Sequence, residues 1–332
     1  MSAFVVSYYH NVGSWLLGMA TAAPRSEATG MSTVLRTDGL TKHYGQLAAL
    51  EGLTLEVGRG EVLGYLGPNG AGKTTTIRLL LGLINPTAGS AEVFGLDVGR
   101  HPSQVHSRLA YVPGEATLWP SLTGAETLHL LARIHGETDL VYRELLLQRF
   151  EFDGSKKVRA YSKGNRQKIT LIAAFASRAD LLVLDEPTSG LDPLMEQAFR
   201  HSVIEAKENG QTVFLSSHIL DEVEALCDRV AILRAGRLVE IGTLAQMRHL
   251  SALTVQATFP SDPPDIARVP GVSGVQIVGR HLTCHVTGTV DALLGVLAAA
   301  HPITLLSREP SLEELFLSLY GTDKERISEV SR

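Results

Sequence analysis

Residues 67–74, with the sequence GPNGAGKT, decide the fold because they follow the pattern G-x-x-x-x-G-K-[ST] of a phosphate-binding loop. Glycine tolerates positive φ, so successive backbone N–H groups of such a loop can point into one concavity. Residues 61–66 before the loop predict a strand, and residues 73–83 after it predict a helix. The positive end of that helix would face the bound anion, so this stretch predicts a triphosphate site.

Two side chains of the loop have specific roles in such a site. Lys73 would reach the β- and γ-phosphates, and the Thr74 hydroxyl would ligate Mg²⁺. A chance match in a glycine-rich chain is the alternative, and the strand and helix expected on either side of the loop oppose it. The other predicted nucleotide contacts in this stretch are Gly67, Pro68, Asn69, Gly70, Ala71, Gly72 and Thr75.

A second stretch supplies the acidic groups that this chemistry needs. Residues 181–184 read LLVL, which is typical of a strand buried on both faces, and Asp185 and Glu186 follow directly. Asp185 could hold Mg²⁺ through its water shell, and Glu186 could polarise the attacking water. An isolated run of this kind would favour a solvated acidic turn, whereas its combination with the phosphate loop favours catalysis.

Length and composition exclude several other classes. The chain has 332 residues, 44% of them hydrophobic, which is enough for one large domain and one smaller domain. A formal net charge of -5 gives no general attraction to nucleic acid or anionic lipid. Cys227 and Cys284 are the only cysteines in the sequence, too few for a disulfide framework or a zinc site, so a reducing cytoplasm is expected.

No run in the sequence has the roughly 18 consecutive apolar residues of a membrane-spanning helix. The N-terminal residues 4–23 are apolar on average, but polar residues interrupt them, and the first basic residue is Arg25. A signal peptide would begin with a basic region, which argues against one here. Residues 1–32 are therefore expected to be a disordered or mis-called extension, with Met31 as the true start.

The remaining sequence alternates between strand and helix patterns, and after about residue 244 the pattern changes to a proline-rich stretch followed by alternating strands. We predict an α/β domain at 33–244 with a helical subdomain at about 115–176, a small α+β domain at 245–322 and a tail at 323–332. The predicted elements are short strands within 34–57, helices at 126–135, 142–150, 165–176, 194–209 and 220–227, a strand at 212–215, a hairpin at 230–240, strands at 253–259, 275–278 and 281–286, and helices at 290–299 and 311–320.

Four further short motifs occur along the main domain: KHYG with Tyr44, YSKGN at 161–165, SGLD at 189–192 and FLSSH ending in His218. In this order, and together with the phosphate loop and the acidic pair, they resemble the nucleotide-binding domain of the ATP-binding cassette (ABC) transporters. The resemblance covers about 33–243. It implies a P-loop NTPase fold with a mixed β-core and an α-helical subdomain.

The resemblance gives these motifs roles that each residue alone would not justify. Tyr44, expected just before the first strands, matches the aromatic residue that stacks on adenine. Ser189 and Asp192 match the D-loop that bridges two such domains. His218 matches the switch histidine, whose imidazole could hydrogen-bond the γ-phosphate and Glu186. The simpler alternatives are a core tyrosine, a plain loop and a satisfied structural histidine.

Residues 161–165 match the family signature, which acts on the ATP of the opposite subunit. The usual form is Leu-Ser-Gly-Gly-Gln, so three positions differ, with Lys163 and Asn165 among them. Ser162 and Gly164 are kept, and they face the phosphate in the family. A γ-phosphate could be bound by a hydroxyl, a glycine N–H and the N-terminus of a helix. The simpler alternative is that this Ser-x-Gly turn only caps a helix.

Two further stretches refine the resemblance. Gly114 stands where the family has a glutamine that contacts the metal, and the adjacent Glu115 would substitute for it unless the contact is missing. Residues 309–316, EPSLEELF, resemble the C-terminal end of exporter ATPases of the drug-resistance type. Ser311 and Glu314 also form a capping box, so helix initiation explains part of that string.

The implied function is an ATPase that powers export of a drug-like or hydrophobic compound through a separate membrane permease, from the cytoplasmic face of the membrane. One copy has one phosphate loop and one signature, so a homodimer is expected to hold two ATP molecules with Mg²⁺ between Lys73 and Ser162 of opposite chains. The permease would dock on a groove around 111–124. No nucleic acid partner is expected.

The sequence leaves two alternatives to this function. A soluble ABC ATPase without a transport role would carry two cassettes or large coiled-coil or zinc insertions, and the sequence has neither. The second alternative is an unrelated P-loop kinase or GTPase. A GTPase would have an Asn-Lys-x-Asp motif, which is absent from the sequence. Nothing in the sequence identifies the transported compound.

Overall fold

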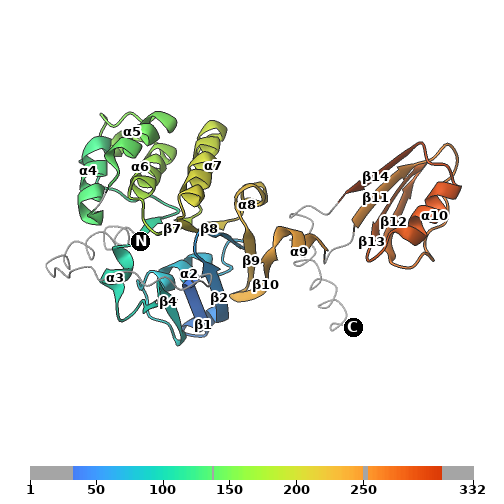
Figure 1. Cartoon of the computed structure of the whole chain (residues 1–332), viewed down its shortest axis with the longest axis horizontal. Helices are drawn as coiled ribbons and strands as arrows, with labels where there is room; N and C mark the ends of the chain where they lie inside the picture. The colour runs from blue at the N-terminus through green and yellow to red at the C-terminus, as the bar shows by residue number, and fades with distance from the viewer. Residues whose placement is uncertain (1–32, 137, 250–252, 309–332) are drawn as a thin grey trace. The chain divides into compact units, whose positions relative to one another are not determined.

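The computed structural model describes residues 33–308 except 137 and 250–252 (Figure 1). The chain divides into two compact units, one ending at Ile241 and the other beginning at Gly242. The predicted extension at 1–32, the predicted helix at 311–320, the string at 309–316 and the tail lie outside the described residues. Among the helices that are described, none has the length and apolar character needed to cross a membrane.

The larger sheet of the first unit carries the phosphate loop and the acidic pair. Its strand order is β10-β9-β3-β8-β7-β6, and β3, β6, β7, β8 and β9 pair in parallel. Every residue of β3 and β7 is buried, which explains their continuous apolar runs. The strands are β3 (Val62–Leu66), β6 (Leu109–Val112), β7 (Leu181–Asp185), β8 (Thr212–Ser217), β9 (Arg229–Arg234) and β10 (Arg237–Thr243).

Parallel pairing brings three loops together at one edge of this sheet. Leu66 at the end of β3 pairs with Ser217 at the end of β8, and Asp185 at the end of β7 pairs with Ser216. The phosphate loop, Glu186 and the loop with His218 therefore leave the sheet side by side, at the carboxyl ends of its strands, where ligands of such sheets bind.

A second, antiparallel sheet packs with helix α2 (Lys73–Leu80), which follows the phosphate loop. Ile77, Leu79 and Leu80 of this helix belong to the same apolar core as Leu35 and Leu50 of the sheet. Its last two strands and helix α3 (Pro102–His106) were not predicted, because they are short and bury few residues. The strands are β1 (Thr33–Tyr44), β2 (Leu47–Gly58), β4 (Ala88–Val93) and β5 (Leu96–Asp97).

Five other helices of the first unit, α4 to α8, form a second apolar core with the large sheet. Helix α4 begins with a capping box, in which Thr123 accepts from the Glu126 N–H and the Glu126 carboxylate accepts from the Thr123 N–H. The first helix predicted in this region, at 126–135, is α4, which begins slightly earlier, at Gly124. The helices are α4 (Gly124–His135), α5 (Leu140–Arg149), α6 (Lys163–Ala176), α7 (Pro193–Glu208) and α8 (Leu220–Leu226).

In the described part of the second unit, helix α10 packs on the apolar face of a four-stranded antiparallel sheet. The strand order is β12-β13-β11-β14, and Leu293 and Leu297 of the helix pack with Val255, Leu282 and Cys284 of the sheet. Strand β14 was not predicted, because all its residues are exposed. The elements are α9 (Leu244–His249), β11 (Leu253–Thr258), β12 (Val272–Val278), β13 (His281–Val286), α10 (Asp291–Ala299) and β14 (Thr304–Arg308).

Candidate functional site

The phosphate loop connects β3 to α2 in a conformation that its glycines make possible. Gly70 and Gly72 have φ values of 83° and 108°, which residues other than glycine rarely adopt. A Cβ on Gly67 would lie 2.6 Å from the Leu233 carbonyl oxygen, and one on Gly72 would lie 2.4 Å from the Ala49 carbonyl oxygen. The loop is thus both turned and tightly packed against its neighbours.

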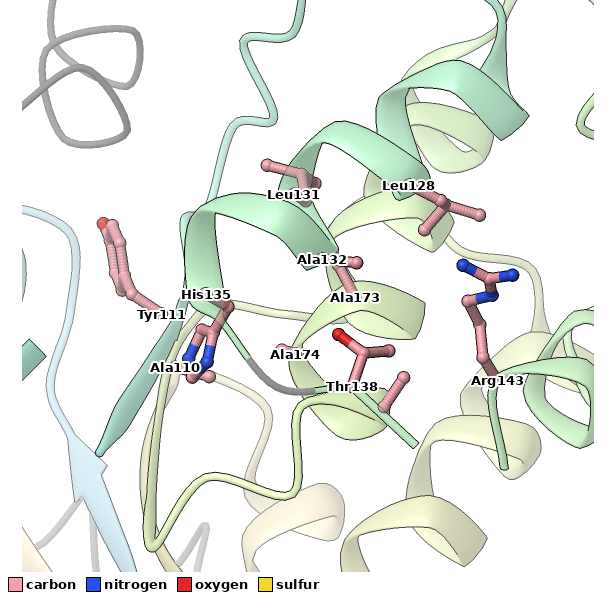
Figure 2. A pocket seen from close by; sticks show the side chains of 11 residues that line it. Ala110, Tyr111, Leu128, Leu131, Ala132, His135, Thr138, Arg143, Ala173 and Ala174 are labelled. Atoms are coloured by element: carbon pink, nitrogen blue, oxygen red, sulfur yellow. The ribbon is translucent and has the colours of Figure 1, made fainter. Parts of the chain in front are cut away.

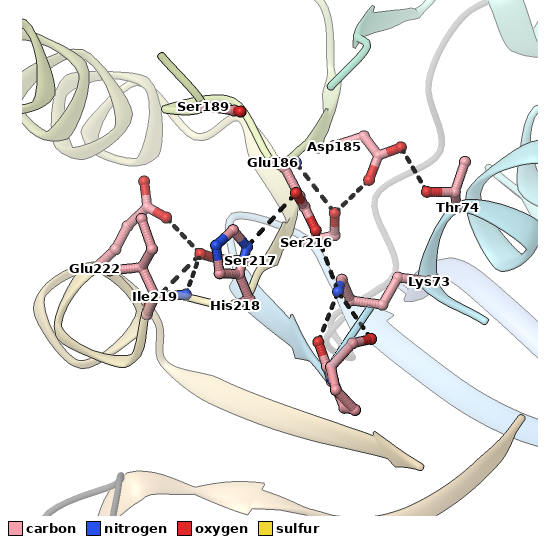
Figure 3. Close-up of polar contacts among 12 residues, drawn as sticks. Lys73, Thr74, Asp185, Glu186, Ser189, Ser216, Ser217, His218, Ile219 and Glu222 are labelled. Atoms are coloured by element: carbon pink, nitrogen blue, oxygen red, sulfur yellow. Dashed lines mark hydrogen bonds and ion pairs between the residues drawn. The ribbon is translucent and has the colours of Figure 1, made fainter. Parts of the chain in front are cut away.

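Lys73 occupies the centre of the site although it carries a charge. Its side chain is only 5% exposed, and its Nζ donates to the Gly67 carbonyl oxygen at 2.6 Å and lies 3.2 Å from Oε1 of Glu186 (Figure 3). A buried ammonium needs compensating acceptors. The loop carbonyls and Glu186 provide them, which holds the cation beside the space where phosphates would lie.

Asp185 is almost completely buried at the end of β7. Thr74 Oγ1 donates to its Oδ2 at 3.2 Å, and Ser216 Oγ donates to its Oδ1 at 2.6 Å (Figure 3). Burial raises the pKa of the Asp185 carboxyl, while these two hydrogen bonds act in the opposite direction. A cation beside this carboxylate would compensate the cost of its burial.

The donor set fits Mg²⁺. Within 33–308, apart from 137 and 250–252, no group of three or more His, Cys, Asp or Glu side chains could hold a metal alone. Mg²⁺ at nucleotide sites needs only one or two protein oxygens, because phosphates and water supply the rest. The Thr74 hydroxyl and the Asp185 carboxylate, which are joined by a hydrogen bond of 3.2 Å, form such an oxygen pair.

Glu186 links the other charged groups of the site. Its φ of 47° is in the left-handed region, which is uncommon for residues other than glycine and is found at functional sites. Its backbone N–H donates to the Ser216 carbonyl at 3.0 Å, which fixes this turn. Oε1 faces Lys73, and Oε2 lies 3.5 Å from Nδ1 of His218. The side chain is 27% exposed, so water can reach the carboxylate.

One cleft contains the predicted adenine and phosphate contacts. Tyr44 is 46% exposed and shares this cleft with the phosphate loop. The expected position of Tyr44 before the first strands was wrong, because it is the last residue of β1. Gly67 and Ala71 do not line the cleft. Its lining residues are Tyr44, Leu47, Ala48, Ala49, Pro68, Asn69, Gly70, Gly72, Lys73, Thr74, Thr75 and Glu186.

The signature residues and the D-loop contact each other within one chain. Ser162 caps α6, since its Oγ accepts from the Asn165 N–H at 3.2 Å. Lys163 Nζ donates to Ser189 Oγ at 2.7 Å, and a Cβ on Gly164 would lie 2.3 Å from the Gly190 carbonyl oxygen. No described contact joins the signature to the phosphate loop of the same chain.

The other predicted D-loop residue has a structural partner. Asp192 caps α7, because its Oδ1 accepts from the Met195 N–H at 3.1 Å. A pocket beside the D-loop extends from Glu186 and Ser189 to His218. Glu186 therefore lines this pocket as well as the nucleotide cleft.

Gly114 lies against the acidic pair although it has no side chain. A Cβ there would be 3.1 Å from the Asp185 carbonyl oxygen and 3.7 Å from Cβ of Glu186. Glu115 is exposed, and no described contact joins it to Thr74, Asp185 or Glu186. The substitution of Glu115 for the family glutamine thus finds no support in the described contacts.

We expect Gly114→Ala to lower kcat for ATP by about tenfold, because the added methyl group would displace the backbone that positions Asp185 and Glu186. Glu115→Ala is the matched control, and its kcat should stay within about twofold, as for other exposed positions. Steady-state phosphate release measures both variants. An unchanged rate for Gly114→Ala would mean that this close approach is not needed for catalysis.

Two further residues hold the site in place and were not predicted from the sequence. Ser216 donates to Asp185 and accepts from the Glu186 N–H at 3.2 Å, so it holds both acids. Gln167 of α6 is fully buried, and its Nε2 donates to the Pro113 carbonyl at 3.0 Å, next to Gly114. A hydroxyl at the end of an apolar strand and an amide within a buried helical face are the sequence signals that point to them.

A small cavity lies between β6, α4 and α6 (Figure 2). Tyr111 is its only lining residue from the groove at 111–124 that was predicted to receive the permease. The cavity and the predicted groove are therefore different surfaces. The lining residues are Ala110, Tyr111, Leu128, Leu131, Ala132, His135, Thr138, Arg143, Ala173, Ala174 and Ala176.

Comparison with known proteins agrees with this geometry. Residues 50–189 match the ABC transporter family. The daunorubicin resistance ATP-binding protein DrrA3 of Streptomyces coeruleorubidus is 36% identical, over 90% of this chain and 99% of that protein. The linearmycin resistance ATP-binding protein LnrL of Bacillus subtilis is 32% identical, over 87% of this chain and 98% of that protein. A solved ATP-binding subunit of an ABC transporter is 35% identical with a TM-score of 0.62, over 66% of this chain and 93% of that one.

Proposed function

The chain belongs to the ABC transporter family, and from that premise we propose that it binds and hydrolyses ATP to power export through a separate membrane permease. One observation carries the proposal: Lys73, Asp185, Glu186 and His218 meet beside the cleft that Tyr44 lines. The family and the fold predicted from the sequence are confirmed by the comparisons.

Each side chain has a defined task in hydrolysis. Lys73 neutralises phosphate charge from its buried position. Glu186 accepts a hydrogen bond from the attacking water and orients it, and His218 faces the same carboxylate. Thr74 and Asp185 would hold Mg²⁺, which when bound neutralises the β- and γ-phosphate oxygens. Catalysis therefore depends on positioning and charge rather than on a covalent intermediate.

A second copy of the chain would complete the site. The described contacts of Ser162 and Lys163 are with their own helix and D-loop, so this face of α6 has no phosphate to contact in its own chain. In a head-to-tail pair it would cover the ATP on the phosphate loop of the partner. Two ATP molecules would then lie between the subunits.

The transported compound is proposed from the relatives. The names of DrrA3 and LnrL refer to resistance to daunorubicin and linearmycin, and a third relative, BcrA of Bacillus licheniformis, is a bacitracin transport ATP-binding protein with 39% identity over 63% of this chain. These names favour export of a drug-like or hydrophobic compound. The chain would work at the cytoplasmic face of the cell membrane, bound to its permease.

Reconstitution tests this function. The full chain would be co-purified with a candidate polytopic membrane protein and placed in lipid vesicles with the ATP site outside. We expect ATP-dependent uptake of a hydrophobic drug into the vesicles, and none with the Glu186→Gln chain. ATP hydrolysis by a chain that binds no membrane protein and supports no uptake would instead favour a role outside transport.

A further inference from the structure

Glu222 is a buried acid that the proposed mechanism does not use. It lies in the first turn of α8 and is only 2% exposed. Burial raises the pKa of its carboxyl, and the hydrogen bond from Ser217 opposes this. A carboxyl group is costly at such a position, so its presence calls for a specific partner.

That partner is the loop that carries His218. Ser217 Oγ donates to Oε2 of Glu222 at 2.6 Å and also accepts from the Ile219 N–H at 3.0 Å. Ser217 and Ile219 are the two neighbours of His218 in the chain. One hydroxyl, fixed by Glu222, therefore holds the backbone on both sides of the histidine.

His218 depends on this support because little else holds its ring. The side chain is 52% exposed, and its contact with Glu186 at 3.5 Å is its one hydrogen bond or ion pair among the described residues. In Figure 3, Glu222 lies on one side of the loop and the ring of His218 points to Glu186 on the other. The backbone of 217–219 thus decides whether the imidazole faces the carboxylate.

Glu222 also faces elements other than this loop. Thr188, which follows Glu186 closely in the chain, is close to its carboxyl, as are Arg200 and Glu196 of α7. Glu222 therefore lies between the loop that carries His218 and the segment that follows Glu186.

We propose that Glu222 is a positioning residue for ATP hydrolysis, which acts through Ser217 to keep the imidazole of His218 within reach of Glu186. The proposal rests on the proposed function, because His218 has its role only if the cleft holds ATP. Loss of Glu222 should therefore reduce the rate of hydrolysis without weakening nucleotide binding.

Steady-state hydrolysis and nucleotide titration of the full chain test this division. For Glu222→Leu we expect kcat to fall by about tenfold, as for other misplaced catalytic groups, with the Kd for ATP little changed. Glu222→Gln keeps an oxygen that can accept from Ser217, so most of the rate should return. Asp221→Asn changes an exposed acid in the same helical turn and is the matched control, expected to keep its rate within about twofold.

A double mutant separates positioning from general damage. If Glu222 acts through His218, adding Glu222→Leu to His218→Ala should cost no further rate in single-turnover assays. Should Glu222→Leu fail to fold, Ser217→Ala removes the same hydrogen bond and should give the same loss of kcat.

Two results would overturn the proposal: an unchanged kcat for whichever of these two variants folds, or a further loss in the His218→Ala background equal to that in the wild type. A wild-type chain without ATPase activity would instead contradict the proposed function itself.

Discussion

Replacing Glu186 by glutamine is expected to stop ATP turnover while nucleotide binding stays intact. Glutamine has nearly the same shape, but its neutral amide cannot take up a proton or polarise water as the carboxylate does. The carboxylate has the geometry for this task, since it faces both Lys73 and His218 and remains open to water. We expect kcat to fall by about 10²- to 10⁴-fold, the usual contribution of a general base.

Phosphate release at saturating Mg·ATP and a fluorescence titration of nucleotide would measure the two effects separately. Glu208→Gln removes the same charge from an exposed position at the end of α7, and it should change kcat by less than about twofold. If Glu186→Gln hydrolysed ATP at a near-normal rate, the base would have to be another group.

Replacing Lys73 by alanine should instead abolish tight nucleotide binding. The ammonium is buried between the Gly67 carbonyl and Oε1 of Glu186, so its loss removes the cation of the phosphate site and the donor to both of these oxygens. Hydrogen bonds to charged groups contribute about 1.5–3 kcal/mol, so we expect the Kd for ATP to rise by about 10- to 100-fold.

Titration of ATP by calorimetry, with a thermal melt of the same samples, checks this second prediction. Lys156→Ala, at an exposed position of the helical region, should bind ATP like the wild type. A folded Lys73→Ala chain with unchanged affinity would place the triphosphate elsewhere. The two substitutions thus separate chemistry from binding, because Glu186 should govern kcat and Lys73 should govern Kd.

The elements around the site were predictable because they depend on local patterns. The glycine spacing of 67–74 and the apolar run before Asp185 predict the loop and the strand, and both occur in the structure. Short elements such as β4, β5 and β14 were not predicted, because they bury too few residues to produce a period in the sequence. Tertiary pairing, rather than their own composition, makes them strands.

The contacts of the site could be predicted only in part. Lys73 and Glu186 are far apart in the sequence, and only the parallel order of β3, β8 and β7 brings them to 3.2 Å. The positive φ of Glu186 has no local signal, and the support that Ser217 gives to His218 depends on a buried acid in the next helix. The roles of Tyr44 and Ser162 remain predictions: Tyr44 lines the cleft with the phosphate loop, and Ser162 caps its own helix.

The most direct test of the account is the molar mass of the Glu186→Gln chain by light scattering, with and without Mg·ATP. Because the signature of one chain must cover the ATP of another, we predict a dimer that contains two nucleotides when Mg·ATP is present and a monomer when it is removed. A chain saturated with ATP that remains monomeric at every concentration would contradict the account.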